Sequence, residues 1–278
     1  MTDRKKTNQG KGRRRAICGV QYLFLTIMAV ISVFPFLWMI ISATNSSMDI
    51  ILGKMSFGGE LMNNIKNLLG AGDLLNCLKN SAILSLFITT LSILICSLAG
   101  YGFVVFKSRA KEFWFSVILL SMMIPTSSLV IPLFKMFSGM GLLNTKLGVM
   151  LPSLSTAFLI FFFRQNTKSF PQETIQAARI DGLGELGIFF KIYMPMMKPT
   201  YSAAIIITFM SSWNNYMWPL ISLQTPDQRT LPLLISSLGT AYTPDYGMIM
   251  VGIIITTIPS ALIFFFMQKS FVNRDRKS

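Results

Sequence analysis

The chain of 278 residues contains no histidine and only three cysteines, and charged residues make up 13% of it. Cys18, Cys77 and Cys96 are far apart in the sequence. The usual metal-ligand spacings and the base of a histidine-dependent catalytic triad are therefore missing. Soluble domains average about 25% charged residues, so the low charge argues against an ordinary soluble enzyme. What is abundant instead is apolar sequence, at 52%.

The few charges leave six uncharged stretches that are 17 to 28 residues long. A helix needs about 20 apolar residues to cross a bilayer, with about 17 near the lower limit. Blocks such as Phe161-Phe162-Phe163 lack the alternation of barrel strands. We therefore predict an all-α polytopic membrane protein, and we expect its first helix to be an uncleaved anchor because it exceeds a signal-peptide core in length. The six predicted transmembrane helices cover residues 16–43, 80–106, 113–134, 147–163, 199–226 and 246–268.

Basic residues are divided unevenly between the two sides of this membrane domain, which covers residues 16–268. Nineteen of the 25 lie on the side that carries both termini, and six lie on the other side. Because positive residues concentrate in cytoplasmic loops, both termini are predicted to be cytoplasmic. The basic tails, residues 1–15 and 269–278, are interpreted as orientation signals that also attract anionic lipid, with no role in nucleic-acid binding. Arg164, at the end of the shortest stretch, is expected to extend to the membrane surface.

One predicted cytoplasmic segment, residues 164–198 between the fourth and fifth membrane helices, is too long for a plain connector. Pro171 suits the first turn of a helix, and Gly182 suits the position after a helix C-terminus. These residues predict a short helix over 172–181. A second helix is predicted over 185–193, closed by Pro195.

Two adjacent alanines, Ala177 and Ala178, lie at the centre of this helix–turn–helix. Small side chains allow another protein's surface to approach the backbone closely. Arg179 and Asp181 follow them and could fix the angle at which such a partner docks. The segment is therefore a candidate docking element.

The spacing in this segment resembles the coupling loop of the membrane permease subunits of ATP-binding cassette importers, which has the pattern E-A-A-x3-G-x9-I-x-L-P. The matching residues are Gln176, Ala177, Ala178, Gly182, Ile192 and Pro195. Gln176 replaces the usual Glu and Met194 the usual Leu. Because Gln still forms hydrogen bonds but carries no charge, we expect docking to be weakened and not abolished. The continuation Arg179-Ile180-Asp181-Gly182 is typical of the sugar-type branch.

Further matches to the family cover about residues 16–272. They are Met123-Ile124-Pro125, Ile131-Pro132-Leu133, Gly141-Leu142-Leu143-Asn144-Thr145 and Trp213-Asn214-Asn215-Tyr216-Met217-Trp218-Pro219-Leu220. The resemblance implies a permease subunit in a bacterial cell membrane that forms, with a second permease subunit, a pathway for a sugar or oligosaccharide. It also implies an extracytoplasmic solute-binding protein and two ATPase subunits. The chain has no Walker A sequence, so ATP hydrolysis is expected in the partners. No catalytic residue, metal or cofactor is expected in this chain.

Polar residues inside the uncharged stretches are candidates for the solute pathway. The densest group is Ser211, Ser212, Trp213, Asn214 and Asn215, and a second group around a predicted kink contains Pro125 and Ser127. The amides could bind solute hydroxyls and the tryptophan could stack on a sugar ring. Hydrogen bonding between helices and local packing are the alternative roles. For Trp218, anchoring at the membrane interface is favoured.

Other functions predict different features. An ion-coupled transporter normally carries ionisable residues within the membrane, and the six stretches have none. The same absence favours a neutral solute over glycerol-3-phosphate, although a permease for that or another polar metabolite stays an alternative. A transporter or channel acting alone would leave the Ala-Ala-x3-Gly-x9-Ile spacing unexplained, and a membrane scaffold predicts no transport defect when the protein is deleted.

Overall fold

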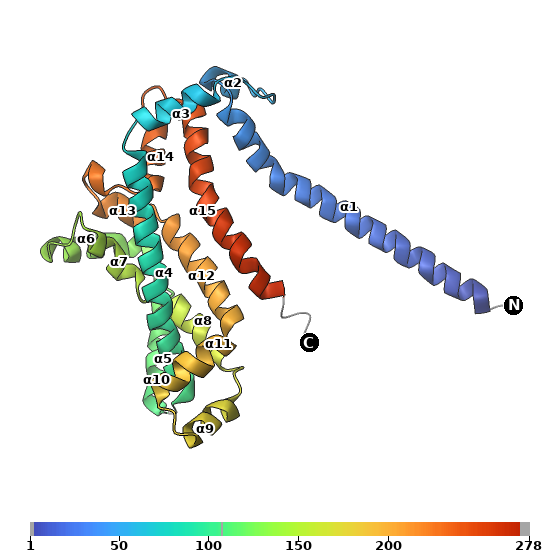
Figure 1. Ribbon diagram of the computed structural model, residues 1–278, viewed down its shortest axis with the longest axis vertical. Coiled ribbons are helices and arrows are strands. Elements are labelled where there is room, and N and C mark those ends of the chain that lie inside the picture. Colours follow the sequence, from blue (N-terminus) through green and yellow to red (C-terminus); the bar gives the residue numbers. More distant parts are fainter. Residues whose placement is uncertain (1–2, 107, 273–278) are drawn as a thin grey trace. The chain divides into compact units, whose positions relative to one another are not determined.

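The computed structural model describes residues 3–106 and 108–272, and the regular elements in them are all helical (Figure 1). Residues 1–2 and 273–278 of the two predicted basic tails lie outside the described part. The α-helices are α1 Asp3–Ala43, α2 Ser47–Ile51, α3 Leu61–Gly70, α4 Leu74–Val105, α5 Arg109–Ser121, α6 Thr126–Gly139, α7 Lys146–Met150, α8 Ala157–Thr167, α9 Gln172–Ile180, α10 Glu185–Ile188, α11 Met194–Met196, α12 Lys198–Trp213, α13 Met217–Ser222, α14 Leu231–Gly239 and α15 Tyr246–Val272. Short turns of 3₁₀-helix cover Leu151–Ser153 and Pro226–Gln228, and a π-helical turn covers Phe189–Tyr193.

The chain forms two compact units. One consists of Met1–Leu68 with Ala241–Ile254, and the other of Leu69–Thr240 with Ile255–Ser278. In the first unit, the buried amide of Asn64 donates to the carbonyl oxygens of Ala43 and Asn45, at 2.9 and 3.0 Å. Asn64 in α3 thereby satisfies backbone carbonyls at the C-terminal end of α1, which lack partners within that helix.

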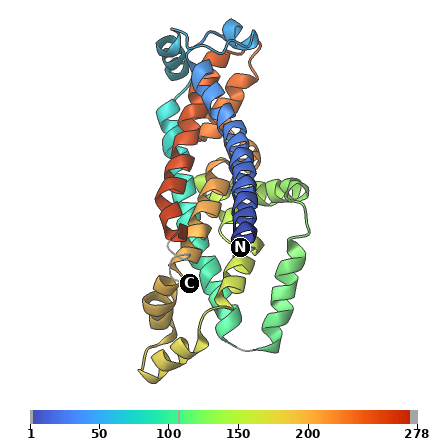
Figure 2. The ribbon, with the colours of Figure 1, turned by 90° about the vertical axis from the view of Figure 1, so that its right-hand side faces the viewer.

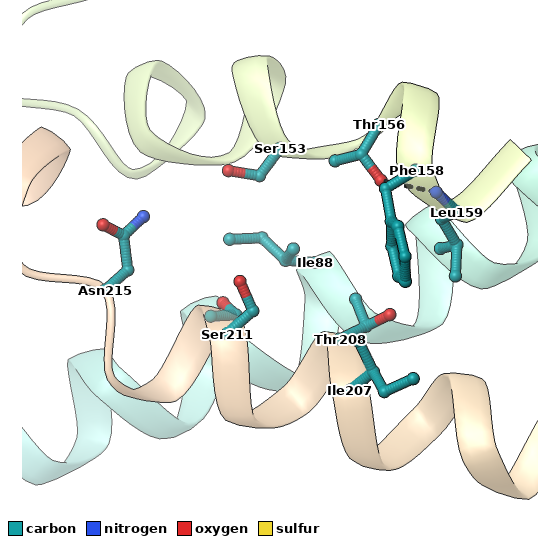
Figure 3. Close-up of a pocket in the computed structure, with 10 residues that line it drawn as sticks. Ile88, Ser153, Thr156, Phe158, Leu159, Ile207, Thr208, Ser211 and Asn215 are labelled. Atoms are coloured by element: carbon teal, nitrogen blue, oxygen red, sulfur yellow. Dashed lines mark hydrogen bonds between the residues drawn. The ribbon is translucent and has the colours of Figure 1, made fainter. Parts of the chain in front are cut away.

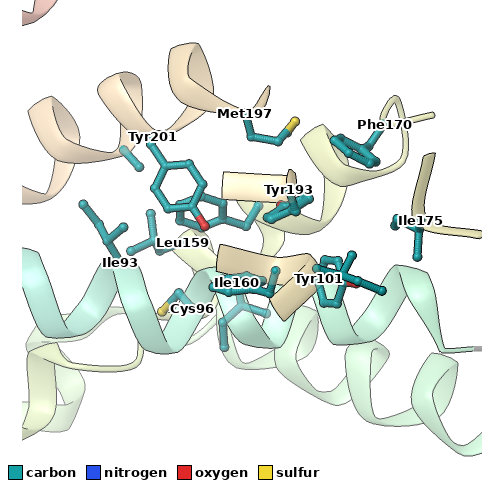
Figure 4. Packing of buried hydrophobic residues seen from close by; sticks show 14 of the residues in the cluster. Ile93, Cys96, Tyr101, Leu159, Ile160, Phe170, Ile175, Tyr193, Met197 and Tyr201 are labelled. Atoms are coloured by element: carbon teal, nitrogen blue, oxygen red, sulfur yellow. The ribbon is translucent and has the colours of Figure 1, made fainter. Parts of the chain in front are cut away.

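In the second unit, α4 packs against α8 and α12. Gly100 allows the close crossing of α4 and α8, because a Cβ at this position would lie 2.6 Å from Phe163 Cβ and 2.8 Å from the Arg164 amide nitrogen. Buried apolar residues from these three helices and from the segment after α8 form one continuous core (Figure 4). The segment that carries the family motif is therefore packed into the same body as the long helix α4.

Replacing Gly100 by alanine is expected to destabilise the protein by about 1–3 kcal/mol, the usual cost of overpacking. Gly102 provides a matched control in the same helix, because nothing lies within 4 Å of a Cβ added there. Gly102→Ala should be neutral or stabilise by up to about 1 kcal/mol, since alanine favours the helix. Unfolding in detergent micelles measures both. Equal effects of the two substitutions would contradict the close crossing.

Among the described residues, three helices are long and apolar enough to cross a membrane, and their spans are Ile17–Ala43, Leu74–Val105 and Tyr246–Met267. Two further candidates are bent pairs. Ala110–Ser121 and Thr126–Gly139 meet at 100°, and Lys146–Ser153 and Ala157–Thr167 meet at 41°. These spans confirm an all-helical protein with several membrane helices, whereas the number of six and the orientation of the termini stay predictions.

The interruption predicted at Pro125 is present as the 100° bend between α5 and α6, which Figure 2 shows clearly. The residues before Pro125 form tight turns, with the Met123 and Ile124 amides donating to carbonyls three residues earlier. Proline has no amide hydrogen and disfavours a helical residue before it. The sequence therefore ends α5 here, and α6 starts in a new direction.

The continuous helix that we predicted over 199–226 is wrong. The helix α12 ends at Trp213 after 16 residues, about 24 Å at 1.5 Å per residue, which is short of a 30 Å bilayer core. The Asn214 side chain donates to the Met210 carbonyl, the same oxygen that accepts from the Asn214 amide. Pro219, moreover, has no amide hydrogen for the carbonyl four residues before it. Both features stop the helix between Trp213 and Met217.

Candidate functional site

The first half of the segment 164–198, called loop 164–198 below, has the conformation that we predicted. The helix α9 covers Gln172–Ile180, and Gly182 has φ of +83°. The Gly182 amide donates to the Arg179 carbonyl at 3.1 Å, and the Leu183 amide donates to the Ala178 carbonyl at 3.0 Å. This pair of bonds is a Schellman motif, which requires a left-handed residue at the position of Gly182. Gly182 therefore sets the angle at which the chain leaves α9.

The second half differs from the prediction, because Pro195 does not close the helix. The chain is helical from Glu185 to Met196 through a π-helical turn at Phe189–Tyr193. In a regular helix, the ring of Pro195 would clash with the carbonyl of Lys191 and leave it without a donor. The wider π turn just before Pro195 changes the hydrogen-bond register. Pro195 is thereby accommodated inside the helical run, which breaks only at Met197 before α12.

The inner face of loop 164–198 is an aromatic cluster around Tyr193, which is completely buried. The Tyr101 ring from α4 packs edge-on against Tyr193, with a centroid distance of 4.9 Å (Figure 4). It also packs edge-on against Phe189, with a centroid distance of 5.4 Å. The hydroxyl groups of Tyr193 and Thr167 are 2.6 Å apart. Burial raises the pKa of the Tyr193 phenol, so the hydroxyl stays neutral. These contacts fix the loop to the ends of α4 and α8.

The two predicted docking alanines have different surroundings. Ala177 is exposed, whereas Ala178 is 4% exposed and belongs to the core with Ile175 and Ile188. The prediction that both alanines offer their backbone to a partner therefore applies to Ala177 alone. Ala178 is small because α9 packs closely on its own chain.

Arg179 also has a role within the chain. Its Nε donates to Glu185 Oε1 at 2.6 Å, and this bond raises the pKa of the guanidinium. The hydroxyl of Tyr101 donates to the other carboxylate oxygen of Glu185 at 3.4 Å. Arg179 thus connects the two helices of the loop, while Asp181 is the exposed C-terminal cap of α9. Of the remaining motif residues, Gln176 is exposed and Ile192 is partly buried against the core.

The outward face of the loop contains apolar residues that are not part of the family motif. Ile180 is 87% exposed and Leu186 is 67% exposed, and Ile180 lies one helical turn from the exposed Ala177. Helical spacing could have identified Ile180, because the buried Ile175 and Ala178 define the opposite face of α9. The loop thus combines a rigid buried face with an exposed apolar face.

A second feature is a hollow of about 120 Å³ between the start of α8 and the end of α12 (Figure 3). In Figure 3, Ser153 and Thr156 lie across the hollow from Thr208 and Ser211. Its lining residues are Ile88, Ser153, Thr156, Phe158, Leu159, Ile207, Thr208, Ser211, Ser212 and Asn215. We call it the α8–α12 hollow. Its lining is uncharged, with five hydroxyl groups, one amide and one phenyl ring.

Only some of the predicted pathway residues line the hollow. Ser211, Ser212 and Asn215 line the hollow. Trp213 does not line it, because it is buried and donates its Nε1 hydrogen to the Thr256 carbonyl at 2.9 Å. Asn214 is exposed and lies outside the hollow lining.

Pro125 and Ser127 are exposed residues at the bend between α5 and α6, and neither lines the hollow. Phe158, and not Trp213, supplies the hollow's aromatic ring. Phe158 and the hydroxyl groups of Ser153 and Thr156 were not predicted, because they lie in an otherwise apolar stretch.

In the second unit, two family motifs, residues 141–145 and 213–220, each contact residues that follow the other motif. Asn144 has φ of +58°, and its Oδ1 accepts hydrogen bonds from the Gln224 and Thr225 amides at 3.0 and 3.1 Å. Trp218 is buried, and its Nε1 donates to the Gly148 carbonyl at 2.9 Å. Trp218 therefore joins α13 to α7, and our expectation of interfacial anchoring is wrong.

Known proteins resemble this chain over most of its length. It is 48% identical over 260 residues to the lactose transport system permease protein LacG of Rhizobium radiobacter, covering 94% of this chain and 95% of the relative. It is 34% identical to the arabinooligosaccharides transport system permease protein AraQ of Bacillus subtilis, covering 90% and 91%. A chain of a bacterial ABC transporter involved in the import of the acidic polysaccharide alginate has the same fold, with a TM-score of 0.81 at 19% identity, covering 92% of this chain and 96% of that one.

The family that matches residues 92–277 is described as the inner membrane component of binding-protein-dependent transport systems. The matched region contains the loop 164–198, the joint around Asn144 and, except for Ile88, the lining of the α8–α12 hollow. The chain therefore belongs to this family of multi-pass membrane permeases of ABC importers.

Proposed function

We propose that this permease forms, with a second permease subunit, the translocation pathway for a sugar or oligosaccharide. A solute-binding protein delivers the solute, and two ATPase subunits supply the energy, one of which docks on the exposed apolar face of loop 164–198. The observation that carries the proposal is the position of this loop, which has an exposed face at Ala177 and Ile180 and a buried face in contact with α4. A displacement of the docked face is transmitted to α4 and α8 because the core between them is closely packed.

The experiment is reconstitution in lipid vesicles with the subunits encoded by the neighbouring genes. ATP hydrolysis should require the solute-binding protein loaded with its sugar, and sugar uptake should require ATP. Uptake by this chain alone, without ATP or partners, would contradict the proposal and favour a transporter acting alone. Omitting one subunit at a time identifies which partners are needed.

The α8–α12 hollow supports a neutral, hydroxylated solute, because hydroxyl and amide groups can bind sugar hydroxyls while Phe158 offers a ring face. The lining residues include no Lys or Arg. A phosphorylated solute such as glycerol-3-phosphate is less favoured for this reason, and because the relatives compared above are named for sugars. Binding of sugar in competition with its phosphate ester distinguishes the two solutes.

Replacing Asn215 by leucine is expected to lower sugar uptake about tenfold, which corresponds to 1.4 kcal/mol. The substitution removes a polar group from the hollow and fills part of its volume. The neighbouring Asn214→Leu is the matched control and should keep uptake near the wild-type rate, because Asn214 is exposed outside the hollow lining and the Asn214 amide and Pro219 still end α12 when the side-chain bond to Met210 is lost. Radiolabelled sugar uptake by vesicles measures both. Equal loss in the two variants would show that the hollow does not contact the solute.

A further inference from the structure

The loop that follows α1, residues 46–59, exposes apolar side chains although it is too short to bury them. Met48, Ile51, Leu52, Met55 and Phe57 are each between 59% and 75% exposed. In Figure 1 this loop, which includes α2, lies at the end of α1 opposite the N-terminus. The part of the loop after α2 projects away from α3. We call these five residues the apolar tip.

The base of the loop, in contrast, is polar and fixed by hydrogen bonds. The Asn45 side chain donates to the Ser56 carbonyl at 2.8 Å, and the Gly58 amide donates to Thr44 Oγ1 at 2.9 Å. Asn45 itself is only 1% exposed. The two ends of the loop therefore close on each other, as in a compact Ω-loop. The apolar tip is held outward by this rigid base, so its exposure is not the result of a loose chain.

The position of the base is set by a membrane helix. The apolar span Ile17–Ala43 ends three residues before the loop begins, and its residues 17–37 are all exposed. A helix of this composition lies in the hydrocarbon core, and its end lies near the interface with water. The apolar tip, tied to Thr44 and Asn45, is consequently held within a few residues of that interface.

The charges in the loop also indicate the kind of partner. Asp49 and Lys54 form an ion pair at 3.3 Å, so they neutralise each other. The loop contains no Trp, Tyr or Arg, the residue types that dominate protein–protein hot spots. Its aliphatic, Met and Phe side chains instead match the apolar faces that insert between lipid headgroups.

We propose that residues 46–59 form an interfacial anchor, whose apolar tip inserts into the lipid headgroup region beside α1. The anchor fixes the depth of α1 and the tilt of the first unit in the bilayer. This role depends on the membrane location of the chain and is independent of which solute is transported. The anchor and the transport proposal can therefore fail separately.

The test is the accessibility of a nitroxide spin label in the full importer complex in lipid nanodiscs. Cys18→Ala first removes the exposed cysteine, since Cys77 and Cys96 are buried. Phe57→Cys and Leu52→Cys then carry the label in separate samples. The references are Leu37→Cys on the exposed apolar side of α1 and Lys66→Cys on the exposed polar side of α3.

Labels at Phe57 and Leu52 are expected to collide more often with molecular oxygen than with a water-soluble nickel chelate, as the label at Leu37 does. This result should be the same with and without the solute-binding protein. Chelate accessibility equal to that at Lys66 would overturn the proposal. Protection that appears only when solute-binding protein is added would overturn it as well, because the tip would then be a protein-docking surface. Two positions are labelled so that the test still gives a result if one of the two variants fails to fold.

Discussion

Replacing Glu112 by glutamine is expected to lower the free energy of unfolding by about 2–3 kcal/mol. Arg164 Nη2 lies 2.7 Å from both carboxylate oxygens of Glu112, and the Arg164 side chain is only 8% exposed. Removing one partner of a fully buried pair costs about 3–5 kcal/mol, because the other charge stays buried without compensation. The expected loss of about 2–3 kcal/mol is smaller than this, because Glu112 is 67% exposed and its charge is partly screened by solvent.

Chemical unfolding in detergent micelles measures this effect, and two variants act as controls. Glu173→Gln, on the exposed first turn of α9, should cost less than about 1 kcal/mol. The double variant Glu112→Gln with Arg164→Met should recover most of the lost stability, because it replaces the buried charge by an apolar side chain. A Glu112→Gln variant as stable as Glu173→Gln would show that the ion pair does not stabilise the protein.

The Glu112–Arg164 pair also explains how α5 is positioned. The guanidinium lies 3.8 Å from the centre of the Phe115 ring, so α5 contributes both a carboxylate and an aromatic face to Arg164. Lys111 Nζ donates to the Gly102 and Phe106 carbonyls at the end of α4, at 2.6 and 2.8 Å. The first turns of α5 are therefore fixed to α4 and α8. The 100° bend at Pro125 then determines where α6 lies.

The sequence predicted the elements that depend on composition and local chemistry. Uncharged length located the long helices α4 and α15, and Gly182 located the turn after α9 because only its left-handed conformation satisfies the helix end. Arg164 shows where this reasoning stops. Its side chain was expected at the membrane surface, but it is buried because Glu112, 52 residues away, provides a counter-charge. A pairing of that kind is a property of the tertiary structure.

The same limit applies to the candidate site. The repeat of Ile175 and Ala178 marks the buried face of α9, so the exposed face could be predicted from helical periodicity. The hollow could not, because the hydroxyl groups just before α8 and those of α12 are about 50 residues apart in the sequence and meet only because α8 and α12 both pack on α4. Asn214 and Asn215 were equivalent in sequence, and the break in α12 turns only Asn215 into the hollow.

Replacing Ala177 by tryptophan is expected to lower ATP hydrolysis stimulated by the loaded solute-binding protein by about 30-fold, while the protein keeps wild-type stability. A bulky side chain on the exposed face separates the loop from the ATPase, and the loss of such a central contact costs about 2 kcal/mol. Ala177 is exposed, so tryptophan there does not disturb the core. Hydrolysis by the reconstituted complex and unfolding of the isolated permease measure the two quantities.

The neighbouring Ala178→Trp provides the contrast, because Ala178 is 4% exposed and packs with Ile175 and Ile188. It should lower the free energy of unfolding by at least about 1–3 kcal/mol, since the core has no room for the added ring. The two adjacent substitutions therefore separate docking from folding. Wild-type hydrolysis in the Ala177→Trp variant would exclude this face as the coupling surface. A loss of stability equal to that of Ala178→Trp would show that Ala177 also belongs to the core.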